Sequence, residues 1–187
     1  MKFKKEFLIS GVSILGLIFF FLFNNKINHL NEVSIVGFLL VLFIFYFSDK
    51  LFNFNFETIH YLLIIYVATS GFLLSCFMFI FKYMDKVLHF TGGVILALII
   101  FHISKKLKIQ KKAFFTFIVC LMIILIYEII EYLMGYFSIT QMQGVFVYLN
   151  GEYKMILSPL RDTLADIFLG IFGGLIYLFG KFKSTVL

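Results

Sequence analysis

The feature that most constrains this chain is a series of six long apolar runs separated by short polar segments. They cover residues 7–23, 33–47, 58–81, 87–103, 113–133 and 163–179. A bilayer core about 30 Å thick needs about 17–25 apolar residues in a helix. The run 33–47 is the shortest, and its 15 residues would rise only about 22 Å as a helix. We therefore expect an all-α polytopic transmembrane bundle of six spans, with 33–47 extending into its polar flanks.

The composition excludes a water-soluble domain. Of the 187 residues, 62% are hydrophobic and 14% charged, whereas soluble domains are about 45–50% apolar and about 25% charged. The net charge of +6 does not indicate nucleic-acid binding, because the basic residues lie in short clusters between the apolar runs. We expect a single integral membrane domain over residues 1–187. Its expected partner is membrane lipid, with a second copy of the chain as a further candidate.

The distribution of lysine and arginine predicts the orientation of the chain in the membrane. If the N-terminus is inside, the inner segments hold 11 of the 16 Lys and Arg residues, and the outer segments hold five. The inner segment 105–112 alone carries five lysines. Because short cytoplasmic loops are enriched in Lys and Arg, we expect both termini in the cytoplasm.

The longest connection, residues 134–161, precedes the last apolar run and is predicted to lie outside. Two β-prone runs, 145–149 and 152–157, flank Asn150 and Gly151 in this connection. An Asn-Gly pair between such runs is typical of a type I′ hairpin turn, which needs positive φ at both central residues. We therefore expect a small outer β-hairpin between the last two spans.

Ionisable residues gather at the predicted outer ends of the last three spans. Each span carries two of them, three or four residues apart and so on one helix face. The pairs are Asp85 with His89, Glu128 with Glu131, and Asp162 with Asp166. A charged group inside a membrane costs about 2.5–3.5 kcal/mol on insertion scales, so these side chains should face the bundle interior and one another.

Five carboxylates and one imidazole in contact need their charge to be neutralised, and the sequence leaves three ways open. The carboxylates could share protons, a divalent metal could bind them, or basic side chains such as Arg161, Lys86 and Lys82 could pair with them. Imidazole and carboxylate ligands suit Zn, Mn or Fe. A purely structural set of interhelical hydrogen bonds is the remaining alternative.

The metal interpretation assigns a role to each of these residues. The candidate ligands are His89, Glu128, Asp166 and Asp85. The first three lie about one helical turn deeper than the other member of their pair. Glu131 and Asp162 are then the candidate general bases. Arg161, the single arginine of the chain, is a candidate for binding an anionic lipid head group, because its guanidinium suits bidentate contacts with phosphate.

Glycines follow the ionisable residues on two of these spans. They are Gly92, Gly93, Gly170, Gly173 and Gly174. Small residues at such spacing allow membrane helices to approach closely. We expect them to pack the fourth span against its neighbours and to hold the polar pairs at the bundle interior.

The segments 85–93, 127–131 and 162–174 resemble the YjdF-like family of small bacterial inner-membrane proteins and, more distantly, the VanZ-like family. The similarity covers about residues 80–180 and implies a bacterial cytoplasmic membrane. The chain departs from the VanZ-like pattern at Gly170, where that family carries Asn, and at Leu160, where it carries Gly. VanZ-like proteins are tied to glycopeptide resistance and envelope phenotypes, so the resemblance implies an envelope-related role.

Three functions remain open from the sequence. The first is an accessory membrane protein whose outward-facing polar site binds a metal, protons or a lipid head group. The second is a membrane-embedded, metal-dependent hydrolase or transferase that acts on an envelope lipid. The third is a small ion-coupled transporter, which intramembrane carboxylates would suit.

Overall fold

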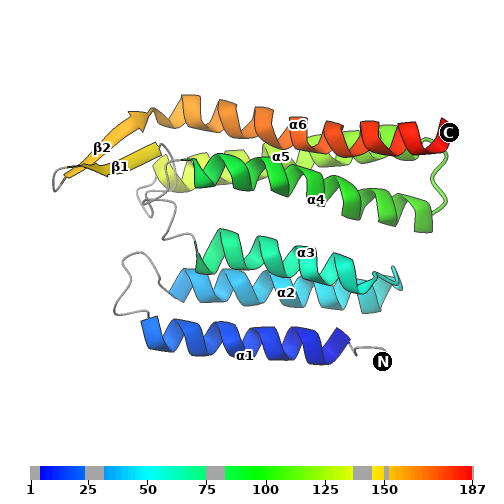
Figure 1. Ribbon diagram of the computed structural model, residues 1–187, viewed down its shortest axis with the longest axis horizontal. Coiled ribbons are helices and arrows are strands. Elements are labelled where there is room, and N and C mark those ends of the chain that lie inside the picture. Colours follow the sequence, from blue (N-terminus) through cyan, green and yellow to red (C-terminus); the bar gives the residue numbers. More distant parts are fainter. Residues whose placement is uncertain (1–4, 24–31, 75–82, 137–144, 150–151, 187) are drawn as a thin grey trace. The chain divides into compact units, whose positions relative to one another are not determined.

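A computed structural model describes residues 5–23, 32–74, 83–136, 145–149 and 152–186 of the chain (Figure 1). The backbone contacts divide the chain into two compact units, Met1–Met78 and Phe79–Leu187. We call them unit 1 and unit 2 and describe each by itself.

Unit 1 is built from helices α1 (Lys5–Phe23), α2 (Glu32–Phe52) and α3 (Thr58–Ala68), which continues into a short π-helix, η1 (Thr69–Leu73). The α2 helix packs against both α1 and α3. On α1 the buried residues recur every three or four positions, at Ile9, Ser13, Gly16 and Phe20. This spacing is one stripe of a helix, and the remaining apolar side chains of α1 are free to face lipid.

Asp49 joins the three helices of unit 1 at one end. Its side chain is 6% exposed, and its Oδ2 atom lies 2.8 Å from the Lys5 ammonium on α1. The Tyr61 hydroxyl of α3 donates a hydrogen bond of 2.6 Å to the same oxygen, and the Phe56 backbone N–H donates to Oδ1 at 3.0 Å. Because a positive charge and two hydrogen bonds satisfy the carboxylate, α2 continues past the apolar run.

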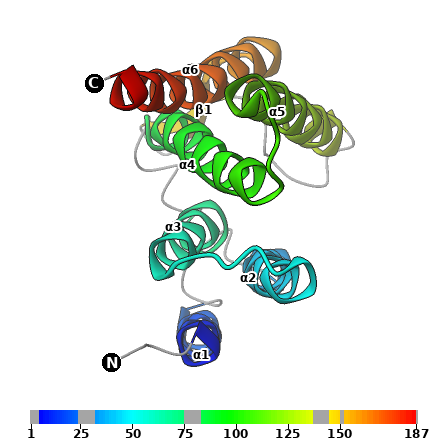
Figure 2. The same ribbon diagram turned by 90° about the vertical axis from the view of Figure 1, so that its right-hand side faces the viewer.

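Unit 2 is built from helices α4 (Met84–Lys106), α5 (Lys112–Tyr136) and α6 (Pro159–Val186), which run side by side (Figures 1 and 2). Glycines bring α4 and α6 into backbone contact. A Cβ atom added to Gly93 would overlap the carbonyl oxygen of Gly170, and one added to Gly173 would overlap that of Phe90. Side chains at these positions would therefore force the two helices apart.

The other predicted packing glycines differ in what surrounds them. A Cβ on Gly170 would also lie 3.2 Å from the Ile124 side chain of α5, and one on Gly174 would lie 3.6 Å from the carbonyl oxygen of Gly93. A Cβ on Gly92 would meet nothing within 4 Å. Gly92 faces away from the helix contacts, so its expected packing role is not supported and helix packing does not require glycine there.

Between α5 and α6 the described residues include two short strands, β1 (Val145–Leu149) and β2 (Glu152–Leu157). They pair antiparallel, with Val147 opposite Lys154 and Leu149 opposite Glu152, and the register is irregular near Val145. The turn residues Asn150 and Gly151 lie outside the described part of the chain. β2 leads through Ser158 into α6, which begins at Pro159.

Five of the helices are long and apolar enough to cross a membrane: α1, α2, α4, α5 and α6. The second apolar run extends into its polar flanks, as expected. The α2 helix reaches Phe52, and Asp49 and Lys50 in this extension find partners in Lys5 and Glu6. The expected length of the third span needs correction. The third, expected over 58–81, is the shorter apolar helix Thr58–Leu73, and residues 75–82 lie outside the described part.

Candidate functional site

The ionisable residues of unit 2 converge at one end of its helices. The first turns of α4 and α6 and the last third of α5 supply them, because α5 runs antiparallel to both neighbours. The helical spacing places the two residues of each helix on the face that meets the other two. As a result, the side chains that were expected to meet lie within a few ångströms of one another. We call this group the polar cluster; its members are Asp85, Lys86, His89, Glu128, Glu131, Asp162 and Asp166.

Lys86 is the centre of one half of the polar cluster. Its ammonium lies 2.9 Å from Asp85 Oδ2, 2.5 Å from Asp162 Oδ1 and 2.7 Å from both carboxylate oxygens of Asp166. The lysine side chain is only 16% exposed. One buried ammonium therefore links α4 to two successive turns of α6.

From the sequence, Lys86 was only one of three basic side chains that could pair with the carboxylates, and it was not among the predicted site residues. A pattern in the sequence does place it there. Lys86 lies four residues before Phe90 and seven before Gly93, the positions at which α4 touches α6. Helical periodicity puts residues at these intervals on one face, so the contact face of α4 carries a lysine at its N-terminal end.

His89 is the centre of the other half. Its Nδ1 atom lies 3.0 Å from Glu128 Oε1 on α5, and its Nε2 atom lies 3.3 Å from Asp85 Oδ1 and 3.9 Å from Asp166 Oδ1. The imidazole thus stands between α5 on one side and the aspartates of α4 and α6 on the other. The deeper set expected from the sequence, His89, Glu128 and Asp166, is brought together.

Glu128 is the most buried member of the polar cluster. Its side chain is 1% exposed, yet neither carboxylate oxygen accepts a hydrogen bond within the described residues. The Oε2 atom of Glu131, one turn further along α5, is also buried without such a bond. Among the described residues, three of the four carboxylate oxygens of α5 are therefore buried without a hydrogen bond, and the Lys86 ammonium contacts only the aspartates.

Two overlapping groups of side chains have the composition of a metal site. One is Asp85, His89 and Asp166, and the other is His89, Glu128 and Glu131, each with its ligand atoms within 4.8 Å of one another. The aspartates of the first group already contact the Lys86 ammonium. The second group has no ammonium and is the one that a cation would complete.

Arg161 lies apart from these contacts. It is exposed in the first turn of α6 and forms no ion pair with any residue that the structure describes. The pairing of Arg161 with the carboxylates, one of the alternatives left open by the sequence, is therefore not observed among the described residues. Lys82, the third base considered, lies outside the described residues.

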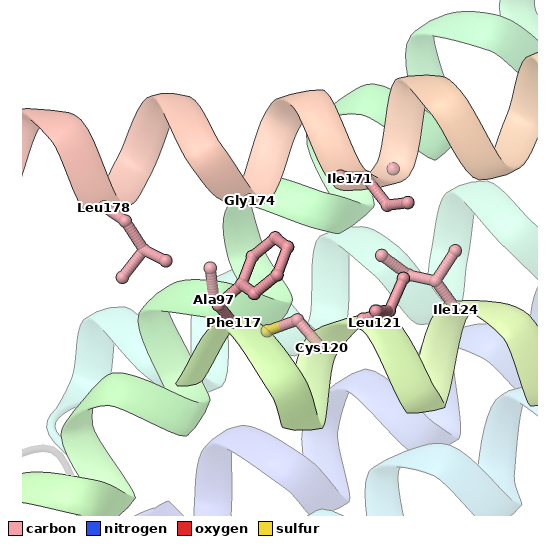
Figure 3. Close-up of a pocket in the computed structure, with 9 residues that line it drawn as sticks. Ala97, Phe117, Cys120, Leu121, Ile124, Ile171, Gly174 and Leu178 are labelled. Atoms are coloured by element: carbon pink, nitrogen blue, oxygen red, sulfur yellow. The ribbon is translucent and has the colours of Figure 1, made fainter. Parts of the chain in front are cut away.

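The interior of unit 2 beneath the polar cluster is apolar. Ile124 lies one turn from Glu128 and Gly170 one turn from Asp166, and both line a small pocket between the three helices. Figure 3 shows its other lining side chains, among them Ala97, Phe117 and the buried Cys120. Within this part of the structure, no ionisable side chain continues from the polar cluster into the interior.

The comparison with known families agrees with these observations. The family model described as "Predicted membrane protein (DUF2238)" matches residues 7–183, a range that includes every member of the polar cluster. No curated protein and no solved structure matches the chain. With five apolar helices of spanning length and a family match over nearly its whole length, the chain is a multi-pass membrane protein that belongs to the DUF2238 family of predicted membrane proteins.

Proposed function

We propose that the polar cluster binds one divalent metal ion, with Nδ1 of His89 and the carboxylates of Glu128 and Glu131 as its protein ligands. The observation that carries this proposal is Glu128, which is 1% exposed with neither oxygen hydrogen-bonded in the described residues. Burial of a carboxylate without hydrogen bonds is unfavourable, and its one charged neighbour, His89, is shared with Asp85. A bound cation would compensate both α5 carboxylates at once.

The spacing of the donor atoms suits a metal ion. Two ligands each about 2.1 Å from an ion lie about 3.0 Å apart at an octahedral angle and about 3.4 Å apart at a tetrahedral one. Nδ1 of His89 and Oε1 of Glu128 are 3.0 Å apart. Imidazole and carboxylate ligands favour Zn, Mn or Fe, and three protein ligands leave at least one coordination position for water or a substrate oxygen.

The aspartates support this assignment from the other side of the imidazole. A histidine that binds a metal through one ring nitrogen generally donates its other N–H to a carboxylate, which orients the ring. Asp85 lies 3.3 Å from Nε2, and Lys86 contacts Asp85 and Asp166. Asp85 and Asp166 therefore orient His89, and Lys86 keeps them from acting as ligands themselves.

The topology proposed with this site is six spans, including the short α3, with both termini in the cytoplasm of a bacterial cell. The lysines of segment 105–112 support this orientation, because the positive-inside rule places them in the cytoplasm. The polar cluster and the β1–β2 hairpin then face outward. The resemblance of segments 85–93, 127–131 and 162–174 to YjdF-like and VanZ-like proteins supports an accessory role in the cell envelope.

A metal-dependent hydrolase or transferase that acts on an envelope lipid is the second candidate. Two observations favour it: the three-ligand donor set leaves a coordination position open, and Arg161 stands exposed one residue before Asp162. Arg161 would bind a lipid phosphate, and Asp162 would serve as the general base. An ion-coupled transporter is disfavoured, because Ile124, Cys120 and Ala97 leave no polar path beneath the cluster within the described residues.

The test is elemental analysis of the purified full chain by inductively coupled plasma mass spectrometry. We expect about one metal ion per chain in the wild type and in Glu32→Gln, which changes an exposed carboxylate at the start of α2. Glu128→Gln and His89→Ala should lose the metal while keeping the wild-type elution volume and helical circular dichroism. A wild-type chain without metal after growth with Zn, Mn and Fe would refute the proposal.

A further inference from the structure

The end of unit 2 opposite the polar cluster carries a group of lysines. Lysines there come from the last turn of α4, the connection to α5, the first residue of α5 and the last part of α6. They are Lys105, Lys106, Lys108, Lys111, Lys112 and Lys181, and we call this surface the lysine end. Figure 1 shows the α4–α5 connection and the C-terminus at the same end of the helices.

No carboxylate side chain opposes these lysines within unit 2. The sequence contains no Asp or Glu between Lys86 and Tyr127, and none after Asp166. Of the six lysines, only Lys112 is partly buried; the others are exposed. The five lysines of segment 105–112 therefore present a field of one sign, which attracts anions over about 8 Å at physiological salt.

The α4–α5 connection holds its lysines in a defined arrangement. The backbone N–H groups of Leu107, Lys108 and Ile109 donate to carbonyl oxygens of the last turn of α4, at 2.9, 3.1 and 3.0 Å. Lys108 has φ of 56°, in the left-handed region. Glycine or asparagine adopts this conformation with least strain, so helix termination alone does not explain a lysine there.

Aromatic side chains lie beside two of the ammonium groups. Lys105 Nζ lies 5.4 Å from the centre of the Phe101 ring on α4, and Lys181 Nζ lies 5.8 Å from that of Tyr177 on α6. The two rings contact each other edge to face, with centroids 6.1 Å apart. Cation–π contacts hold an ammonium in place without neutralising it.

An exposed leucine favours a lipid surface over a soluble anion as the partner of these lysines. Leu107, at the tip between Lys106 and Lys108, is 58% exposed. Lysines around an apolar side chain match the boundary between lipid head groups and acyl chains, where the amine meets phosphate and the leucine meets hydrocarbon. A site for a free anion would gain nothing from the leucine.

We propose that the lysine end binds the phosphate head groups of anionic phospholipids in the leaflet that it faces. Each lysine near an anionic membrane surface contributes about fivefold to the affinity at low salt. The hydrogen-bonded connection and the Phe101–Tyr177 pair fix the positions of several ammonium groups, so that these groups can bind neighbouring lipid head groups together. This surface is independent of the metal site, which lies at the other end of the helices.

The proposal is tested by native mass spectrometry of the full chain released from nanodiscs with equal amounts of phosphatidylglycerol and phosphatidylcholine. We expect the wild type to retain at least tenfold more phosphatidylglycerol. The triple variant Lys105→Gln, Lys108→Gln and Lys111→Gln should lower this preference at least fivefold, because three of the six lysines are lost. The matching triple Arg variant keeps the charge and should behave as the wild type.

Two controls identify the partner. Lys50→Gln removes a lysine of unit 1 that pairs with Glu6 at 3.3 Å, and it should keep the wild-type preference. Inorganic phosphate at 10-fold excess over lipid should leave the preference unchanged. Equal retention of both lipids by the wild type, an unchanged preference in the triple Gln variant, or displacement of phosphatidylglycerol by inorganic phosphate would each overturn the proposal.

Discussion

Nδ1 of His89 on α4 lies 3.0 Å from Oε1 of Glu128 on α5, a carboxylate that is 1% exposed. This contact joins α5 to the polar cluster, whereas Lys86 joins α4 to α6. The cluster thus has two halves: aspartates arranged around an ammonium, and glutamates arranged around an imidazole nitrogen. The proposed metal site and the predictions below depend on this division.

Replacement of Glu128 should have opposite effects on stability with and without metal. In a chelator, Glu128→Gln removes a buried charge and should raise the melting temperature by about 2–4 °C, or about 1 kcal/mol. With metal added, the wild type should gain stability and the variant should not. Thermal unfolding of both proteins in detergent, with chelator and with Zn, Mn or Fe, measures this. A lower melting temperature of the variant in chelator would mean that protonated His89 already neutralises Glu128.

Lys86→Met should destabilise unit 2 by about 3–5 kcal/mol, because removal of one partner leaves buried charges unpaired. The charges concerned are Asp85, Asp162 and Asp166, all within 2.9 Å of the ammonium. The combined change Lys86→Met with Asp162→Asn and Asp166→Asn should recover part of the loss. Denaturant unfolding in detergent checks both, with Lys50→Met as the exposed control at less than about 1 kcal/mol. Equal effects of the two lysine changes would refute a buried ion-pair role.

Two adjacent glycines of α4 should respond differently to the same substitution. Gly93→Ala places a Cβ atom against the Gly170 backbone and should cost about 1–3 kcal/mol through displacement of α6. Gly92→Ala meets nothing within 4 Å and should be neutral or stabilising by up to about 1 kcal/mol, since alanine favours helix. Melting temperatures of the two variants provide the comparison. If Gly92→Ala proved the more harmful, the α4–α6 contact described here would be wrong.

Asp49 should be the ionisable residue on which unit 1 depends most. Asp49→Asn removes the negative partner of Lys5 and weakens two hydrogen bonds, and we expect a loss of about 2–3 kcal/mol. Tyr61→Phe removes one of those hydrogen bonds and should cost about 1 kcal/mol. Protease sensitivity of the 53–57 connection between α2 and α3, followed by mass spectrometry, reports on this end of the unit. An unchanged cleavage rate in Asp49→Asn would contradict the role.

Several features of the structure follow from local rules that a sequence carries. An apolar run in a membrane forms a helix because no water is available to satisfy its backbone groups. The places of α1, α4, α5 and α6 could therefore be predicted within a few residues. Residues spaced by three or four share a helix face, which is why His89, Glu128 and Asp166 could be predicted to meet.

The tertiary structure decided the rest, because it depends on how one helix is rotated and shifted against another. Lys86 and Asp166 are 80 positions apart, and helical periodicity does not say which carboxylates an ammonium reaches. The same holds for Asp49, whose contact with Lys5 lengthens α2 beyond its apolar run. The sequence by itself determined which ionisable residues lie near the ends of the apolar helices. Packing alone decided that the ammonium of Lys86 contacts the aspartates while Nδ1 of His89 lies beside Glu128.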